Sequence, residues 1–284
     1  MHHVIQVDVV VAMNLRKIAC LVSVIISYSS NEKVTILPIL SQSTMFSDDI
    51  VVSFGSHLLN GSAEDKQHIA KLIKRFPDVQ FVEYQIDFSL TLSEQAGVQN
   101  RPKAYWHNLA RWTGVKKLRR KQWVFVLDAD EVPDGHLVRK WIPGVYAKLT
   151  RATCYKMASF WYFKRPTFQA TTLEDNPLLI HYNHLTKANI FGDSEREHLV
   201  SHSQCYVQNF FKDDEDQVLW HHYSWVRSKS AMTQKMKHWG HADDRFKDVS
   251  VEKTVEEVFR DDNVNDFVHQ YRYRQVDNVF GIQV

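Results

Sequence analysis

Three carboxylates within four positions follow an apolar run in the middle of the chain. The run Trp123–Leu127 consists of Trp, Val, Phe, Val and Leu, and Asp128, Asp130 and Glu131 come directly after it. Ionised carboxylates this close together at the end of a buried strand repel one another and lose hydration. A divalent cation offsets both costs, and oxygen ligands suit Mg²⁺ or Mn²⁺. The segment is therefore a candidate metal site.

The spacing of the two aspartates determines what they can share. In an extended segment Asp128 and Asp130 project to the same side, while Ala129 projects to the other. Both carboxylates can then bind one metal ion, or one can hold the metal while the other accepts a hydrogen bond from a ribose hydroxyl. The alternative without chemistry is an acidic turn that caps a helix beginning near Gly135.

The elements that would position these residues alternate between strand and helix in the first half of the chain. Apolar, β-branched runs predict strands at Ile18–Ser27, Asp49–Phe54, Val79–Ile86 and Gln122–Leu127. A helix is expected to start at a capping box of Ser62 and Asp65 and to end at Phe76, and another to span Pro102–Leu118. This alternation predicts an α/β fold with a mostly parallel sheet flanked by helices, in which ligands gather at the carboxyl ends of the strands.

The second half has longer polar loops between its elements and is expected to be more variable. Strands are predicted at Cys154–Phe163, Tyr206–Phe211 and Val218–Tyr223. Helices are predicted at Ser228–Trp239, with Met232 and Met236 facing inward, and at Val251–Phe259.

Composition excludes several classes of function. The 284 residues carry 35 Lys and Arg against 33 Asp and Glu, a net charge of +2, so the Lys116–Lys121 cluster does not indicate a nucleic-acid partner. Three cysteines without a CxxC pair indicate reduced thiols and a cytoplasmic location. The apolar runs near the N-terminus are shorter than the roughly 20 residues of a membrane helix, so no membrane span is expected.

The segment Trp123–Pro133, WVFVLDADEVP, resembles the DxD motif of the GT-A-fold glycosyltransferases. An opening strand that ends at Ser27-Tyr28 and further strand–helix units precede it, as in that fold. A second match is WHHYSW, Trp220–Trp225, because a histidine downstream of DxD often completes the metal site in that family. The resemblance covers about residues 18–241, and the overall pattern is similar to glycosyltransferases of chlorovirus-type large DNA viruses, which build capsid glycans.

The resemblance implies a GT-A fold in which successive regions of the chain have different functions. Residues 1–17 would be an extension, 18–150 the half that binds the nucleotide sugar, and 151–284 the more variable acceptor-side half. The implied reaction is metal-dependent transfer, with Mn²⁺ or Mg²⁺, from a UDP-sugar to a glycan or glycoprotein acceptor. Xylose is the first expectation for the sugar, followed by rhamnose, galactose or glucose.

The resemblance also implies roles for particular residues. The metal ligands would be Asp128, Asp130 and His222, with His221 as the competitor, because neighbouring strand residues face opposite sides. The residues expected to bind the nucleotide, beside Asp128, are Ser27, Tyr28, Asp87, Arg101 and Asn108, with Lys103 next to them.

An inverting reaction, which is the expected course, needs a carboxylate to take the proton of the acceptor hydroxyl. In the inverting enzymes that the sequence resembles, this base commonly lies some tens of residues before the metal histidine, and Asp193 and Glu195 fit that interval before His222. The alternatives are the pairs Glu174-Asp175 and Asp213-Asp214. A retaining enzyme requires no such base.

Two other functions compete with this interpretation. A sugar nucleotidyltransferase can share the fold and a carboxylate that binds metal. Enzymes of that class typically have a glycine-rich phosphate-binding loop after the first strand, whereas residues 27–38 of this sequence contain no glycine. The second competing function is that of a non-catalytic glycan-binding module. The intact DADE sequence and the later histidine pair argue against it.

Overall fold

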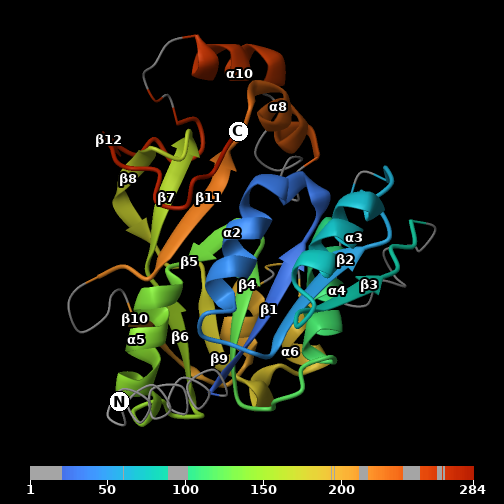
Figure 1. The fold of residues 1–284 in the computed structure, drawn as a ribbon, viewed down its shortest axis with the longest axis vertical. Coiled ribbons are helices and arrows are strands. Elements are labelled where there is room, and N and C mark those ends of the chain that lie inside the picture. Colours follow the sequence, from blue (N-terminus) through green and yellow to red (C-terminus); the bar gives the residue numbers. More distant parts are fainter. Residues whose placement is uncertain are drawn as a thin grey trace, which may run out of the picture.

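The computed structural model describes residues 21–59, 61–88, 102–192, 194, 196–210, 217–238, 250–260, 264 and 266–284. Within these residues the chain forms a large and a small β-sheet with helices packed against both (Figure 1). None of the helices in this part of the chain is both long and apolar enough to cross a membrane.

The large sheet has the strand order β10-β6-β9-β4-β1-β2-β3 within the described residues. Its strands are β1 (Val22–Tyr28), β2 (Ile50–Gly55), β3 (Gln80–Tyr84), β4 (Trp123–Asp128), β6 (Thr153–Met157), β9 (Leu178–His181) and β10 (Tyr206–Phe210). Strand β1 pairs in parallel with β2 and β4, β2 with β3, and β6 with β10, whereas β9 runs antiparallel to β4 and β6. The predicted α/β fold with a mostly parallel sheet is confirmed.

Helices cover both faces of the large sheet. On one face lie α2 (Lys33–Ser43), α3 (Lys66–Arg75) and α5 (Gly135–Tyr146), and on the other α4 (Pro102–Val115), α6 (Lys187–Ile190) and α7 (Arg196–His202). Along β1, Val24 and Ile26 pack in the first core while Ile25 packs in the second. This alternation explains why β1 carries apolar residues on both of its faces, since both are buried.

The small sheet has the order β12-β8-β7-β11-β5 and stands beside the large one. Its strands are β5 (Glu131–Pro133), β7 (Ser159–Lys164), β8 (Phe168–Glu174), β11 (Trp220–Val226) and β12 (Tyr273–Gln275). Helices α8 (Lys229–His238) and α10 (Val251–Phe259) share a core with β7 and β11, in which Met232 and Met236 are buried as predicted. Two short 3-10 helices, η1 (Ser30–Glu32) and η2 (Tyr182–His184), complete the described elements.

One short turn joins the two sheets at the acidic motif. Strand β4 ends in the large sheet at Asp128, and β5 begins in the small sheet at Glu131. Strand β5 pairs antiparallel with β11, with Glu131 opposite His222. The register therefore brings the acidic motif next to the distant histidine.

Several sequence-based boundaries differ from the structure. The predicted strand Cys154–Phe163 is two strands, because β6 joins the large sheet and β7 the small one, with a break at Ala158. Helix α2 was not predicted and contains Pro38. The short elements β5, β8, β9, β12, α6 and α7 were also not predicted. Strands β6, β9 and β10, from beyond residue 150, complete the large sheet.

The predicted start of helix α3 is wrong by three residues. The helix begins at Lys66, and its N-cap is Asp65, whose carboxylate accepts a hydrogen bond from the backbone N–H of His68 at 2.9 Å. Ser62 precedes the helix and does not cap it. A carboxylate at the N-cap satisfies an unpaired N–H and also interacts favourably with the helix dipole.

Substitution at the true cap should therefore destabilise the protein more than substitution at the predicted one. We expect Asp65→Ala to lower the Tm by about 2–4 °C, and Ser62→Ala to lower it by less than about 1 °C. Thermal unfolding followed by circular dichroism measures both. Equal shifts for the two variants would contradict the assignment of Asp65 as the cap.

Candidate functional site

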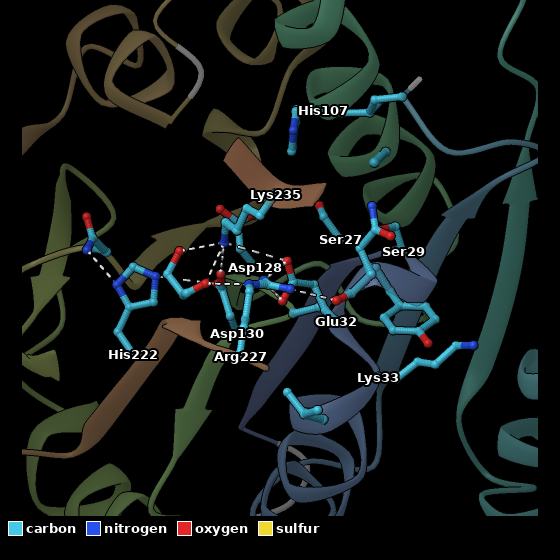
Figure 2. A pocket seen from close by; sticks show the side chains of 18 of the residues that line it. Ser27, Ser29, Glu32, Lys33, His107, Asp128, Asp130, His222, Arg227 and Lys235 are labelled. Carbon is cyan, nitrogen blue, oxygen red and sulfur yellow. Dashed lines mark hydrogen bonds and ion pairs between the residues drawn. The ribbon is translucent and has the colours of Figure 1, made fainter. Parts of the chain in front are cut away.

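A cavity of about 880 Å³ opens at the carboxyl ends of β1 and β4 and extends toward β11 and α8 (Figure 2). Its lining comes from the segment after β1, the β4–β5 turn, β11 and α8, with further residues from β6 and α7. Ser27 on β1 is the register partner of Asp128 on β4, so the ends of these two strands lie side by side. The cavity is at the position where parallel sheets collect ligands.

The turn between β4 and β5 directs the two aspartates to different partners. The backbone N–H of Ala129 donates to the carbonyl of Ser27 at 3.1 Å, and the hydroxyl of Thr35 donates to the carbonyl of Ala129 at 2.6 Å. These bonds fix a turn where an extended segment was expected. Asp128 consequently faces α4 and α7, whereas Asp130 faces β11 and α8.

Asp130 and His222 lie next to each other in the wall of the cavity (Figure 2). Asp130 Oδ1 lies 3.4 Å from His222 Nε2, and Asp130 Oδ2 lies 3.4 Å from Lys235 Nζ. Burial opposes ionisation of Asp130, yet His222 and Lys235 hold its pKa well below the usual range. Burial alone would lower the pKa of His222, but the adjacent carboxylates, Asp130 foremost, raise it to about 10. Without a metal, His222 is therefore an imidazolium at neutral pH, and a metal ion that binds Nε2 would displace its proton.

This pair fits a divalent metal ion. Two ligands of one octahedral Mg²⁺ ion, each at about 2.1 Å, lie about 3 Å apart. The 3.4 Å between Asp130 Oδ1 and His222 Nε2 is close to that distance. Among the described residues no group of three or more His, Cys, Asp and Glu side chains converges on a metal position. A bound ion would therefore take its other ligands from water and from a bound substrate, as Mg²⁺ commonly does.

The neighbouring histidine, His221, has a different environment. Its Nδ1 lies 2.8 Å from the hydroxyl of Tyr162, on which its ring stacks, and Phe280 packs edge-on against it. Burial lowers the pKa of His221 to about 4, so it is neutral. Of the two adjacent histidines, His222 lines the cavity.

Asp128 is held by two guanidinium groups. Arg111 Nη2 lies 3.1 Å from Oδ1, and Arg196 Nη2 lies 3.1 Å from Oδ2. Burial would raise the pKa of Asp128, but Arg196 and Arg111 outweigh it and lower the pKa to about 2. Asp128 remains part of the cavity lining, with its charge compensated by the protein.

Glu131, the third acid of the motif, is fully buried, and its contacts hold other parts of the protein in place. Its two carboxylate oxygens accept from Arg196 at 2.7 and 2.8 Å, and one of them also accepts from the backbone N–H of Asp128 at 2.9 Å. Through these bonds Glu131 fixes both the backbone of the motif and the guanidinium that faces Asp128.

Several charged residues of the site were not predicted from the sequence. Besides Arg111 and Arg196, they include Glu32, Arg227 and Lys235. The guanidinium of Arg227 forms an ion pair with Glu32. Lys235 is almost fully buried, and its Nζ donates to the carbonyl and the hydroxyl of Ser224 at 2.7 Å each. The sequence signal for Arg227 was its position two residues after WHHYSW. Lys235 gave no such signal, because a lysine in a helix is expected on the solvent-exposed face.

The residues expected to bind the nucleotide have diverse locations. Ser27 and Tyr28 line the cavity. Asn108 is buried, donates to the carbonyl of Gly192 at 2.6 Å and accepts from Arg111 at 3.2 Å, so its side chain positions Arg111 and does not face the cavity. Asp87 is exposed and lies outside the lining. Arg101 and the side chain of Lys103 lie outside the described residues.

The carboxylates considered as bases are only partly described. Asp193, Glu195, Asp213 and Asp214 lie outside the described residues. Glu174 lies behind His222, with its Oε2 3.3 Å from His222 Nδ1. Asp175 pairs with Lys156 at 3.3 Å.

Comparisons with known proteins found no matching protein-family model and no matching curated protein. Among solved structures, the chain is similar to a CMP-2-keto-3-deoxy-manno-octonic acid synthetase complexed with CTP, at 8% identity and a TM-score of 0.43 over 67% of this chain and 89% of the other. It is also similar to the mannosyltransferase PcManGT from Pyrobaculum calidifontis in complex with GDP-Man and Mn²⁺, at 12% identity and a TM-score of 0.45 over 77% of this chain and 61% of that one.

A further similar structure is glucosyl-3-phosphoglycerate synthase from Mycobacterium tuberculosis in complex with Mn²⁺, UDP and glucosyl-3-phosphoglycerate. The identity is 14% and the TM-score 0.41, over 90% of this chain and 86% of the other. Identities of 8 to 14% and TM-scores of 0.41 to 0.45 do not assign a function. We therefore infer the function from the site.

The buried contacts of Glu131 predict that it contributes to stability. Glu131→Gln would present an amide donor to Arg196 and to the N–H of Asp128, and we expect the free energy of unfolding to fall by about 3 kcal/mol. Glu256→Gln, which removes one partner of an exposed pair with Lys229, should change it by less than about 0.5 kcal/mol. Urea denaturation distinguishes the two, and wild-type stability of Glu131→Gln would contradict a structural role.

Proposed function

We propose that this protein is a metal-dependent glycosyltransferase of the GT-A type that uses a nucleotide sugar as donor. The observation that carries the proposal is the Asp130–His222 pair, 3.4 Å apart at the carboxyl ends of β1 and β4, in a cavity of about 880 Å³. That volume is near the upper end for small-molecule sites, which suits a ligand as large as a nucleotide sugar.

The charges around the cavity suit a reaction that expels a nucleoside diphosphate. Negative charge develops on the leaving oxygen, and a bound Mn²⁺ or Mg²⁺ would supply Lewis-acid stabilisation of it. Arg227 and Lys235 bring two further cations to the same wall of the cavity (Figure 2). Hydrogen bonds to Ser224 hold the ammonium of Lys235 in place, so little reorganisation would be needed during the reaction.

The part of the cavity at the end of β1 suits the nucleoside. It is lined by Ser27 and Tyr28 of β1 and by Ser29, Ser30 and Asn31, which follow the strand. The hydroxyl of Tyr28 is buried and has no hydrogen-bond partner among the described residues. A buried polar atom without a partner is costly, and a ligand that hydrogen-bonds to it would remove that cost.

The acceptor would enter on the side of β6 and α7, where Lys156, Asn176, Ser194 and Glu197 line the cavity. Their polar groups suit a hydroxyl-rich acceptor such as a glycan or glycoprotein. We propose an inverting reaction with Asp193 or Glu195 as the base, since Ser194 and Arg196, their neighbours in the chain, line the cavity.

A sugar nucleotidyltransferase is the alternative, and the segment after β1 disfavours it. Such an enzyme needs backbone N–H groups that are free to bind a nucleoside triphosphate. Here the N–H of Ser30 donates to the carboxylate of Glu64 at 2.9 Å, and Glu32 adds a second carboxylate nearby. Negative charge at this position opposes the binding of a triphosphate.

The first experiment is a donor screen with UDP-, GDP- and TDP-sugars in Mn²⁺, Mg²⁺ or EDTA. UDP-xylose comes first, because of the resemblance to chlorovirus-type enzymes. We expect slow hydrolysis of one donor, abolished by EDTA and reduced at least about 100-fold in Asp130→Ala and His222→Ala. Glu256→Gln, at an exposed position, should behave as wild type.

Other outcomes of the same screen separate the alternatives. Release of pyrophosphate from a nucleoside triphosphate and a sugar phosphate would establish the nucleotidyltransferase instead. Binding of a glycan array without donor binding would indicate a non-catalytic module. Absence of donor binding with every metal would refute the catalytic proposal.

The role given to Lys235 predicts a defect in turnover. Lys235→Met keeps most of the side-chain volume and removes the charge, so kcat should fall about 100-fold while KM for the donor changes much less. Lys229→Met, on the same helix but exposed and paired with Glu256, is the matched control. Steady-state kinetics with the donor found in the screen test this, and an unchanged kcat would rule out the role.

A further inference from the structure

Glu174, the last residue of β8, lies behind His222 and outside the cavity lining. Its Oε2 is 3.3 Å from His222 Nδ1, on the side of the ring away from Asp130. Asn176 Nδ2 donates to the same oxygen at 2.6 Å. The side chain of Glu174 is 11% exposed, so this carboxylate interacts with the protein and hardly with solvent.

Both ring nitrogens of His222 face carboxylates, Nδ1 that of Glu174 and Nε2 that of Asp130, so both carry a proton until a metal ion displaces the one on Nε2. An ionised carboxylate only accepts hydrogen bonds, so a proton is favoured on Nδ1, which faces Glu174. Asn176 Nδ2 also lies 3.1 Å from Nδ1, but an amide nitrogen is a donor and cannot accept that proton. With the proton held on Nδ1, Nε2 is the nitrogen that can give its lone pair to an ion in the cavity.

The ring of His222 is also held in its orientation. Trp161 meets it edge to face, with ring centroids 4.8 Å apart and an interplanar angle of 85°. Glu174 is in turn fixed through its other oxygen, Oε1, which lies 3.4 Å from the hydroxyl of Tyr271 and 3.4 Å from His269 Nε2. His269 and Tyr271 stack on each other at 4.9 Å. A chain of contacts therefore runs from residues 269–271 to the cavity.

We propose that Glu174 is a positioning residue for His222: it holds the Nδ1 proton, and so keeps the Nε2 lone pair directed at a divalent metal beside Asp130. The inference rests on the proposed function, because it takes His222 as a metal ligand. It also gives Glu174 a role other than that of the base that removes the acceptor proton.

The direct test is Mn²⁺ affinity, measured by electron paramagnetic resonance with and without UDP. We expect Glu174→Gln to weaken Mn²⁺ binding by about 10- to 100-fold, and Glu174→Asp to recover part of the loss because it keeps the charge. Glu256→Gln is the matched control, since it makes the same substitution in an exposed ion pair with Lys229. Its affinity should stay within about threefold of wild type.

The outcomes separate this inference from the proposed function. If His222→Ala and Asp130→Ala bind Mn²⁺ as wild type does, the proposed metal site is wrong. If those variants lose Mn²⁺ while Glu174→Gln stays within about threefold of wild type, the positioning role alone is overturned.

A measurement on the wild-type protein covers the case in which Glu174→Gln does not fold. Nitrogen-15 labelling of histidine reports the protonation of each ring nitrogen, and the spectrum of His222→Gln identifies the signals of His222. On addition of Mg²⁺ we expect the Nε2 proton to be lost and the Nδ1 proton to remain. An unprotonated Nδ1 in the Mg²⁺-loaded protein would overturn the proposal.

Discussion

The compensation of buried negative charge at the junction of the two sheets is the constraint on which this site depends. Three acids of the DADE segment lie where β4 passes into β5, and each is paired with cationic side chains. Arg196 contacts both Asp128 and Glu131, and Arg111 also contacts Asp128. His222 and Lys235 contact Asp130. Without those partners the desolvation of the carboxylates would strongly oppose the fold. The same partners define the electrostatics of the cavity, so stability and the proposed chemistry draw on one set of residues.

The cationic partners differ in how far they leave each carboxylate able to bind something else. Arg196 binds Glu131 through both oxygens, an arrangement that fixes geometry and leaves Glu131 with no lone pair directed at the cavity. His222 and Lys235 instead meet Asp130 at 3.4 Å, a longer and weaker contact than the one at Glu131. An incoming cation can therefore compete for Asp130 far more easily than for its neighbour. The motif thus places a tightly bound carboxylate, that of Glu131, next to a more loosely paired one, that of Asp130.

Local patterns in the sequence predicted the parts of the protein that local forces determine. The apolar runs of β1 and β4, the helix at Val251–Phe259 and the inward methionines of α8 follow from periodicity, and all four are found in the structure. Asp130 and His222 were singled out from their residue types after a strand and from a resemblance, and the structure places their side chains 3.4 Å apart. Lys235 and Arg111 were not, because each lies in a helix whose buried face is decided by tertiary packing. Asn108 shows the converse: a polar residue predicted to face a ligand is used inside the fold.

The junction between the sheets also has a consequence for biogenesis. Glu131 leaves the ribosome 65 residues before Arg196, and Asp130 leaves it 105 residues before Lys235. Contacts between such distant segments form after the local ones, because a long loop must first be closed. The nascent chain therefore carries Asp130 without His222 and Lys235 until β11 and α8 have been synthesised. Every described strand of the large sheet precedes β11 in the chain, so this sheet can begin to assemble while the carboxylate of Asp130 is still hydrated.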